Sequence, residues 1–234
     1  MATKSSPLLC ELHAHSTWSD GAFSIRELSD LYGRRGFDVL AITDHTTRTP
    51  GYVDAGAFER YLAAIDAEAE RARRLYGLVL LPGLELTYDD PEPELAAHAV
   101  AIGLRRFVGV AGGLENALVL SREQGAALVA AHPYPLEEID GSTRPTAAFA
   151  ARPRELAPLV DRFELFNRDT LFEWVAAARL PAVASGDFHR LEHLATWKTL
   201  LPCAKDPEAV VAYLRSPRPA FLVRLDADPA LLAA

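Results

Sequence analysis

Short apolar runs alternate with longer segments of mixed polarity along most of the chain. The runs that predict strands are Leu8–His13, Val39–Thr43, Val79–Leu86, His98–Leu104, Ala127–Ala131, Arg162–Phe166, Ala182–Ser185 and Ala220–Val223. Most of them are continuously apolar, which is typical of strands buried on both faces of a parallel sheet. Strands of this kind, separated by helices, predict an α/β protein.

The spacing of polar and apolar residues between these runs predicts the helices. Ser24 and Glu27 have the spacing of a capping box and predict the start of a helix that Gly36 can end. A long helix over Asp54–Tyr76 is expected to stop before Gly77. Its predicted apolar face contains Phe58, Tyr61, Leu62, Ile65 and Leu75. The other predicted helices are Leu114–Gln124, Leu171–Arg179 and one that begins at Asp206-Pro207-Glu208.

Seven or eight strands with intervening helices favour a barrel related to the (β/α)8 fold, with an open doubly wound sheet as the alternative. No GxGxxG or GxxxxGK[ST] pattern follows a predicted strand, which counts against the nucleotide-binding forms of the open sheet. A length of 234 residues without internal repeats predicts one domain over residues 1–234. The segment Asp140–Pro158 predicts a long loop with one short helix, which could cover an active site.

Charge and cysteine content narrow the classes of function. The chain has 24 basic and 32 acidic residues and a formal charge of −8, which disfavours nucleic-acid binding by bulk charge. A small anionic substrate held by metal ions stays compatible with this balance. Cys10 and Cys203 form no CxxC pair, so a disulfide framework and a thiolate zinc site are disfavoured. With no apolar signal segment over Met1–Pro7 and no membrane-length apolar run, we expect a cytoplasmic protein without membrane contact.

Six of the seven histidines fall at the ends of predicted strands, together with two carboxylates. These residues are His13, His15, His45, Glu85, His98, His132, Asp187 and His189. The carboxyl ends of barrel strands meet at one face, which is where active sites of such barrels lie. His98 alone is at the opposite end of its predicted strand, so its strand would start earlier or His98 would reach in from a loop. His193 lies outside the pattern and is predicted to be a surface or outer-shell residue.

The spacing within these motifs favours a metal cluster. Residues two apart on a strand point to the same side, so His13 with His15, and Asp187 with His189, can aim at one site. Imidazoles and carboxylates without thiolates suit Zn²⁺, Mn²⁺ or Fe²⁺, and the set exceeds what one ion takes. Any one histidine taken alone is more often structural, and Ser19-Asp20-Gly21 by itself predicts only a turn. The repeated coincidence at strand ends favours the cluster.

Five segments in series resemble the motifs of the polymerase and histidinol phosphatase (PHP) family. They are His13-Ala-His-Ser-Thr-Trp-Ser-Asp-Gly21, Thr43-Asp-His45, Pro82-Gly-Leu-Glu85, Ala131-His-Pro133 and Ser185-Gly-Asp-Phe-His189. The resemblance extends from about Glu11 to Pro202 and implies a distorted (β/α)7 barrel with a trinuclear metal site. One ion would take His13, His15, Glu85 and Asp187; a second Glu85, His98 and His132; a third Asp20, His45 and His189.

The resemblance and the ligand set together predict a metal-dependent phosphoesterase. It would hydrolyse a phosphomonoester or nucleotide by attack of a hydroxide that bridges two or three Mn, Zn or Fe ions. Glu85, Asp187 and His189 are the expected catalytic residues. Arg168, Arg190, Lys198 and Asn167 follow the sixth and seventh strands and are candidates to bind the substrate.

Other functions stay open at this point. A 3′-exonuclease or nuclease acting on short nucleic acid is possible because the PHP family includes proofreading domains. A non-catalytic metal- or ligand-binding module is a third possibility, which the complete ligand set disfavours. An amide-cleaving barrel hydrolase usually needs a lysine at a strand end, and no lysine lies between Lys4 and Lys198. The substrate, the metal, the general acid and the oligomeric state are left open.

Overall fold

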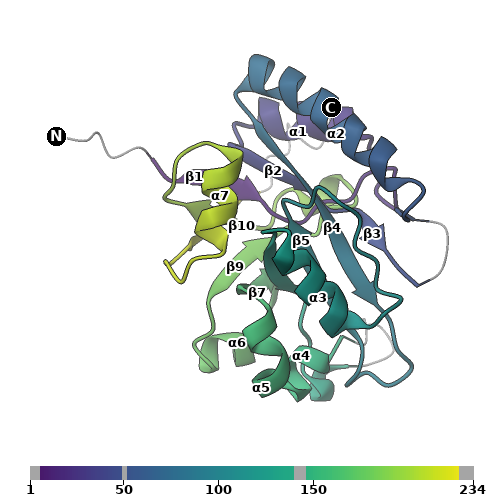
Figure 1. Ribbon diagram of the computed structural model, residues 1–234. Helices are drawn as coiled ribbons and strands as arrows, with labels where there is room; N and C mark the ends of the chain where they lie inside the picture. Colours follow the sequence, from purple (N-terminus) through teal and green to yellow (C-terminus); the bar gives the residue numbers. More distant parts are fainter. Residues whose placement is uncertain (1–5, 49–51, 140–145, 227–234) are drawn as a thin grey trace.

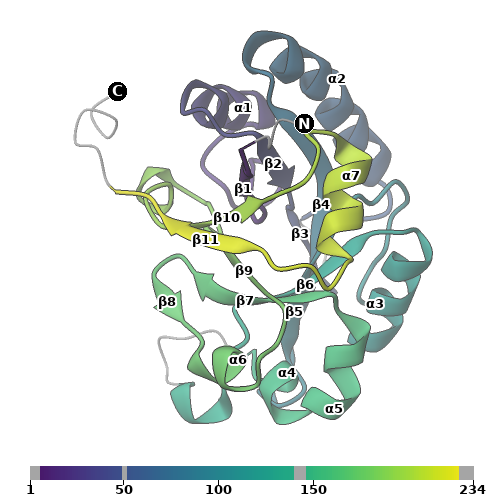
Figure 2. The same ribbon diagram turned by 90° about the vertical axis from the view of Figure 1, so that its left-hand side faces the viewer.

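The computed structural model describes residues 6–48, 52–139 and 146–226, and its architecture is mixed α/β. Figure 1 shows one curled sheet, and Figure 2 shows helices ranged around the outside of its strands. The larger strands are β1 (Leu8–Glu11), β2 (Val39–Ile42), β4 (Val79–Tyr88), β5 (Ala97–Ile102), β6 (Ala127–Ala131), β7 (Arg162–Asn167), β9 (Ala182–Ser185), β10 (Trp197–Leu201) and β11 (Phe221–Arg224). Two short strands, β3 (His45–Thr46) and β8 (Thr170–Leu171), complete the sheet over these residues.

The sheet curls until the ends of β1 and β9 meet. The strand order is β11-β10-β1-β2-β4-β5-β6-β7-β8, with β3 paired to β4 and β9 paired to β7. An isolated parallel bridge joins Ala14, just after β1, to Phe188, just after β9. The amide of His15 donates to the carbonyl of Phe188 at 2.8 Å, and the amide of Phe188 donates to the carbonyl of His13 at 3.0 Å. Two motifs far apart in the sequence are therefore held side by side by backbone hydrogen bonds.

The sheet is not all parallel: β8, β10 and β11 pair antiparallel with their neighbours, and so does β5, the strand that contains His98. β5 runs antiparallel to both of its neighbours, β4 and β6. Its amino end therefore lies at the edge where the parallel strands have their carboxyl ends. His98, near that end, is opposite Thr87 of β4 and Ala131 of β6. This reversal explains why His98 stood at the wrong end of its strand when that strand was expected to run parallel to its neighbours.

The core is divided by the alternation of side chains along the strands. Leu40 and Ile42 of β2 belong to an apolar cluster shared with the helices, whereas Val39 and Ala41 belong to a second cluster. The second cluster joins residues of β1, β2, β4, β5, β6 and β9 with Val210, Tyr213 and Leu214. Successive residues of a strand point to opposite faces, so both faces of these strands are buried, as their continuous apolarity predicted.

The helices confirm most of the predicted starts and stops. They are α1 (Ile25–Arg34), α2 (Phe58–Tyr76), α3 (Leu114–Glu123), α4 (Ala148–Ala151), α5 (Pro153–Leu156), α6 (Glu173–Ala177) and α7 (Pro207–Leu214), with 3₁₀ turns η1 (Leu136–Glu138), η2 (Ala157–Leu159) and η3 (Leu191–His193). The Ser24 and Glu27 capping box is present, and Gly77 ends α2 with φ +64°. Described helices include none with the length and apolarity needed to cross a membrane.

Three local predictions about the helices were wrong. Leu75 is 53% exposed, because the last turn of α2 buries Ala72 and leaves Leu75 outside the packed face. Leu171 belongs to β8, and α6 begins only after Phe172. Residues 146–158 of the predicted long loop contain α4 and α5, while residues 140–145 lie outside the described part of the chain.

Arg162, at the start of β7, anchors the segment that follows α7. Its side chain is buried, and its guanidinium donates to the carbonyls of Leu214, Tyr213, Ser216 and Arg218 at 2.7 to 3.1 Å. The last carbonyls of a helix lack intrahelical partners, and a cation at that end is favoured by the helix dipole. The buried guanidinium therefore satisfies polar groups that would otherwise be unpaired.

We predict that Arg162→Met lowers the free energy of unfolding by about 3 kcal/mol, because the buried carbonyls of Tyr213 and Leu214 lose their donor. The control is Arg105→Met, which removes an exposed pair with Asp66 and should cost less than about 1 kcal/mol. Urea denaturation of the two variants measures the difference. Equal midpoints for the two variants would show that Arg162 does not stabilise this segment.

Candidate metal centre

The predicted strand-end residues lie together at one edge of the curled sheet. His13 and His15 follow β1, His45 opens β3, Glu85 lies in β4, and His98 lies in β5. His132 follows β6, and Asp187 and His189 follow β9. All except His189 are buried, the most exposed of them being Asp187 at 8%. The structure thus brings together every residue that the sequence proposed as a metal ligand, including Asp20.

Glu85 occupies the centre of this group. Its Oε1 lies 3.0 Å from both His98 Nδ1 and His132 Nε2. Its Oε2 lies 3.4 Å from His13 Nε2, 3.3 Å from His15 Nε2 and 2.8 Å from His45 Nδ1. The two oxygens therefore face different sets of histidines, which is the geometry required of a bridging carboxylate.

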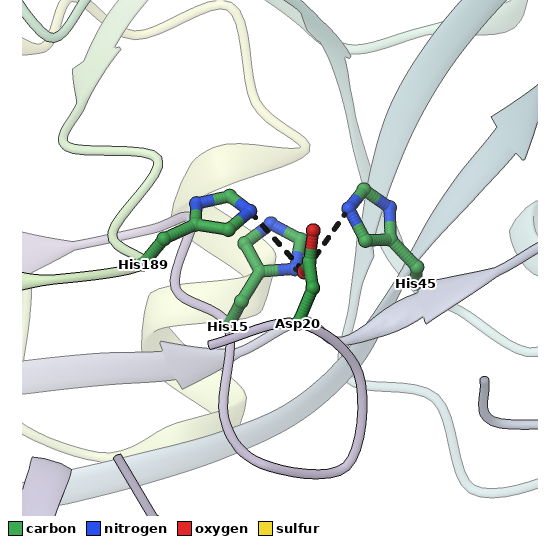
Figure 3. Close-up of side chains that lie close together, drawn as sticks. All are labelled: His15, Asp20, His45 and His189. Carbon is green, nitrogen blue, oxygen red and sulfur yellow. Dashed lines mark ion pairs between the residues drawn. The ribbon is translucent and has the colours of Figure 1, made fainter. Parts of the chain in front are cut away.

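Three sets of side chains offer ligand atoms within 4.8 Å of one another: Glu85, His98 and His132; His13, His15 and Asp187; His15, Asp20, His45 and His189. Figure 3 shows the last set, in which three imidazoles surround the carboxylate of Asp20. Asp20 Oδ1 is 3.3 Å from His189 Nε2, 3.5 Å from His45 Nε2 and 3.8 Å from His15 Nδ1. The segment Ser19-Asp20-Gly21, which by itself predicted only a turn, thus also places the Asp20 carboxylate in the site.

The donor atoms fit divalent cations. Apart from the ion-pair contacts with Glu85 given above, the buried atoms His13 Nε2, His15 Nε2, Glu85 Oε2 and His132 Nδ1 have no hydrogen-bond partner among the described residues. Buried polar atoms are nearly always paired, so four unpaired atoms in one cluster require an explanation. Nitrogen and oxygen donors without sulfur suit Zn²⁺, Mn²⁺ or Fe²⁺. The residues present could therefore hold such ions.

Several of these histidines have a partner on the ring nitrogen that faces away from the cluster. His13 Nδ1 lies 3.0 Å from Glu164 Oε1, and His98 Nε2 lies 3.0 Å from Asp89 Oδ1. His189 Nδ1 contacts the carbonyl of Asp187 at 2.9 Å. Such partners orient metal-binding imidazoles and increase their basicity.

Glu164 was missed by the sequence analysis. It is buried in β7, where its Oε2 accepts from the amide of His132 at 2.6 Å and from Asn167 Nδ2 at 2.8 Å. Its Oε1 also accepts from the hydroxyl of Ser185. One carboxylate thereby connects the ends of β1, β6 and β9. The available signal was a single acidic residue inside the apolar run Arg162–Phe166.

Electrostatics couple the buried acids and bases. Burial alone would raise the pKa of Glu85, but the charges of His45 and His13 hold it well below its usual range. Against the effect of burial, Glu85 raises the pKa of His45 to about 10. Burial lowers the pKa of His15 to about 3. In the metal-free protein, the carboxylate charge is therefore balanced by protons on particular histidines.

A cavity of about 530 Å³ opens beside the cluster. Three of the substrate-binding candidates, Asn167, Arg168 and Arg190, are among the residues that line it. Arg168 also donates to the carboxylate and the carbonyl of Asp187 at 3.0 and 3.1 Å. Asn167 donates one Nδ2 hydrogen to Glu164, so its side-chain carbonyl oxygen and its second amide hydrogen are left for a ligand.

Two predicted positions are corrected by the structure. Lys198 is fully buried in β10, where Nζ lies 2.9 Å from Glu11 Oε2, and it does not line the cavity. Glu11 is fully buried, so Lys198 balances its charge, while its other oxygen accepts from the amides of His13 and Gly186. His193 is 7% exposed and lines the cavity, so the surface alternative of its prediction is wrong, while its contact with the amide of His189 agrees with the outer-shell alternative. The turn η3 carries it back against His189.

Comparison with known proteins supports the interpretation of the motifs. No family model matches the chain. It is 41% identical over 87 residues to the DNA polymerase/3′-5′ exonuclease PolX of Bacillus subtilis, a match covering 34% of this chain and 15% of that protein. It is 31% identical over 137 residues to a 5′-3′ exoribonuclease of Haemophilus influenzae, covering 51% of this chain and 44% of that protein. The aligned part is thus less than half the length of either relative.

The similarity in fold covers more of this chain than the similarity in sequence does. A two-domain protein of Bacteroides vulgatus, described as containing a predicted PHP-like metal-dependent phosphoesterase, superposes with a TM-score of 0.68 at 19% identity. The match covers 94% of this chain and 65% of that protein. The chain has a PHP-like fold. The resemblance predicted from the five motifs is therefore confirmed at the level of the fold.

Replacement of Glu164 should weaken metal binding in this cluster. A glutamine side chain would present an NH2 group to some of the N–H groups whose hydrogen bonds the carboxylate now accepts. It would also remove the negative charge that lies beside His13 Nδ1. We expect Glu164→Gln to lower the affinity of one ion by about 10- to 100-fold. Competition with a chelator measures this loss, with Glu123→Gln on the exposed face of α3 as control. Equal affinities in both variants would contradict the role assigned to Glu164.

Metal uptake should release protons. Because the pKa of His45 is raised to about 10 in the metal-free protein, its ring is protonated at neutral pH and must lose that proton to bind an ion. The apparent affinity should therefore increase from about pH 7 until the pH approaches the pKa of His45. Calorimetry in two buffers of different ionisation enthalpy counts the protons. His45→Gln should release fewer, and an affinity independent of pH would contradict the prediction.

Proposed function

We propose that this protein is a metal-dependent phosphoesterase of the PHP family that hydrolyses a phosphomonoester or nucleotide. The proposal depends on one observation. Buried imidazole and carboxylate atoms without hydrogen-bond partners converge around Glu85, beside a cavity lined by two arginines. A cation cluster next to fixed positive charge is the environment that a phosphate group requires. The PHP-like fold supports this proposal.

The ligands are assigned from the three sets of neighbouring atoms. His13, His15, Glu85 and Asp187 would hold one ion, Glu85, His98 and His132 a second, and Asp20, His45 and His189 a third. His15 lies close enough to the last set to contribute there too. When bound, divalent ions such as Mn²⁺, Zn²⁺ or Fe²⁺ lower the pKa of water and neutralise charge on phosphate oxygens.

Side chains of this protein are assigned the catalytic and substrate-binding roles. Glu85 faces two sets of ligands with its two oxygens, and Asp187 and His189 border both the cluster and the cavity. These three are the proposed catalytic residues. Arg168 is held against Asp187 and would place its positive charge on the phosphate beside the cluster. Arg190 is 65% exposed, lies 2.7 Å from Glu192, and would act at the cavity rim.

Nuclease activity on short nucleic acid is the second candidate. It is favoured by the names of the two relatives, a polymerase with 3′-5′ exonuclease activity and a 5′-3′ exoribonuclease. The same ligand set could serve a phosphodiester, and a cavity of about 530 Å³ would admit only the end of a strand. Bulk charge does not favour long nucleic acid, since the formal net charge is −8.

The decisive assay compares substrates on one protein preparation. The chain is loaded with Mn²⁺ or Zn²⁺ and tested against phosphomonoesters, phosphodiesters and short oligonucleotides. We expect hydrolysis by the wild type and a loss of at least about 10³-fold in His13→Ala/Asp187→Ala, because ligands of the cluster are removed. Glu70→Ala, an exposed acidic position on α2, is the control.

The substrate that is turned over decides between phosphatase and nuclease. Turnover of none of these substrates by protein that holds two or three ions would favour a binding module. Failure to retain any ion, even after reconstitution, would contradict the proposal itself.

A further inference from the structure

His193 is the one histidine that the metal cluster does not use, yet it lies at the cavity. Its side chain is buried except where it lines that space with Arg168, Arg190 and Asp187. The turn η3 (Leu191–His193) follows the Asp187-Phe-His189 motif directly and returns the chain toward it. The ring lies 6.0 Å from that of His189 and meets the ring of Phe188 edge-on at 6.5 Å. The imidazole is therefore packed on two sides.

One hydrogen bond determines where the ring carries its hydrogen. The backbone amide of His189 donates to His193 Nδ1 at 3.1 Å. An amide can only donate, so Nδ1 must be the unprotonated nitrogen. A neutral ring of this kind carries its hydrogen on Nε2, and a doubly protonated ring would set two donors against each other.

The backbone around His193 holds this arrangement in place. The amide of His193 donates to the carbonyl of Arg190 at 3.0 Å. Its carbonyl accepts from Lys198 Nζ at 3.2 Å and from the hydroxyl of Thr196 at 2.8 Å. Lys198 is itself paired with Glu11 beneath the cluster. The buried lysine that cannot reach a substrate therefore helps to fix the residue that can.

We propose that His193 is a substrate-binding residue that donates a hydrogen bond from Nε2–H to a phosphate oxygen in the cavity. This inference rests on the proposed phosphoesterase function. The fixed tautomer adds a directional neutral donor to the charges of Arg168 and Arg190. Because Nδ1 is occupied by the amide of His189, the ring acts as a donor of a hydrogen bond and does not exchange protons with the substrate.

Two substitutions separate the two ring nitrogens. In His193→Asn the side-chain oxygen takes the place of Nδ1 and can accept from the His189 amide, but nothing replaces Nε2. In His193→Gln the amide nitrogen reaches the place of Nε2 and keeps a donor there. We expect His193→Asn to weaken binding of inorganic phosphate by the metal-loaded protein about 10-fold or more. Phosphate is the probe, and KM for p-nitrophenyl phosphate should increase in parallel with little change in kcat.

His193→Gln should recover most of the lost phosphate affinity. Unchanged phosphate affinity and KM in His193→Asn at full metal content would overturn the proposal and leave the proposed function standing. A wild type that binds phosphate but hydrolyses nothing, with binding weakened in His193→Asn, would overturn only the proposed function. A metal-loaded wild type that does not bind phosphate would overturn both.

A measurement on the wild type alone covers the case in which His193→Asn loses metal or fails to fold. Long-range ¹H–¹⁵N correlation spectra of the zinc-loaded protein report which ring nitrogen carries the hydrogen. We expect the hydrogen on Nε2, and we expect the Nε2 resonance to shift when phosphate is added. A hydrogen on Nδ1, or an Nε2 resonance that does not respond to phosphate, would overturn the proposal.

Discussion

The contact on which the site depends is the buried carboxylate of Glu85 surrounded by five imidazoles. His13, His15, His45, His98 and His132 approach its two oxygens at 2.8 to 3.4 Å. Removing such a group from water is costly unless its charge is balanced. In the metal-free protein that balance comes from protons on histidines, and in the proposed holoenzyme it comes from cations. The same demand for positive charge prepares the site for metal binding.

Two features of the backbone bring the ligands to Glu85. Reversal of β5 turns His98 toward the edge where the parallel strands end. The bridge between Ala14 and Phe188 joins the first and last motifs. Beneath them, Glu164 and the Glu11–Lys198 pair connect strand ends through buried hydrogen bonds. The cluster is thus supported by a layer of charged groups, which limits how far the ligands can shift.

His98, Lys198 and His193 show where inference from the sequence stopped. The strand containing His98 was recognised, but its direction depends on which strands pair with it. Lys198 was a reasonable phosphate ligand by chain position, yet its side chain pairs with Glu11 inside the protein. His193 is only four residues from His189, but a 3₁₀ turn brings it to the cavity. In each case the decisive contact is made with a residue of another segment.

The sequence by itself determined the α/β class, most strand and helix positions and the set of candidate ligands that the fold brings together. Those features follow from local patterns, since apolar runs, capping residues and histidines two apart act over a few residues. Only the tertiary structure decided the direction of β5, the burial of Lys198 and the supporting role of Glu164. Glu164 is 151 positions from His13, whose ring it orients. Contacts between residues so far apart in the sequence depend on how the sheet curls, and no local sequence pattern predicts that curvature.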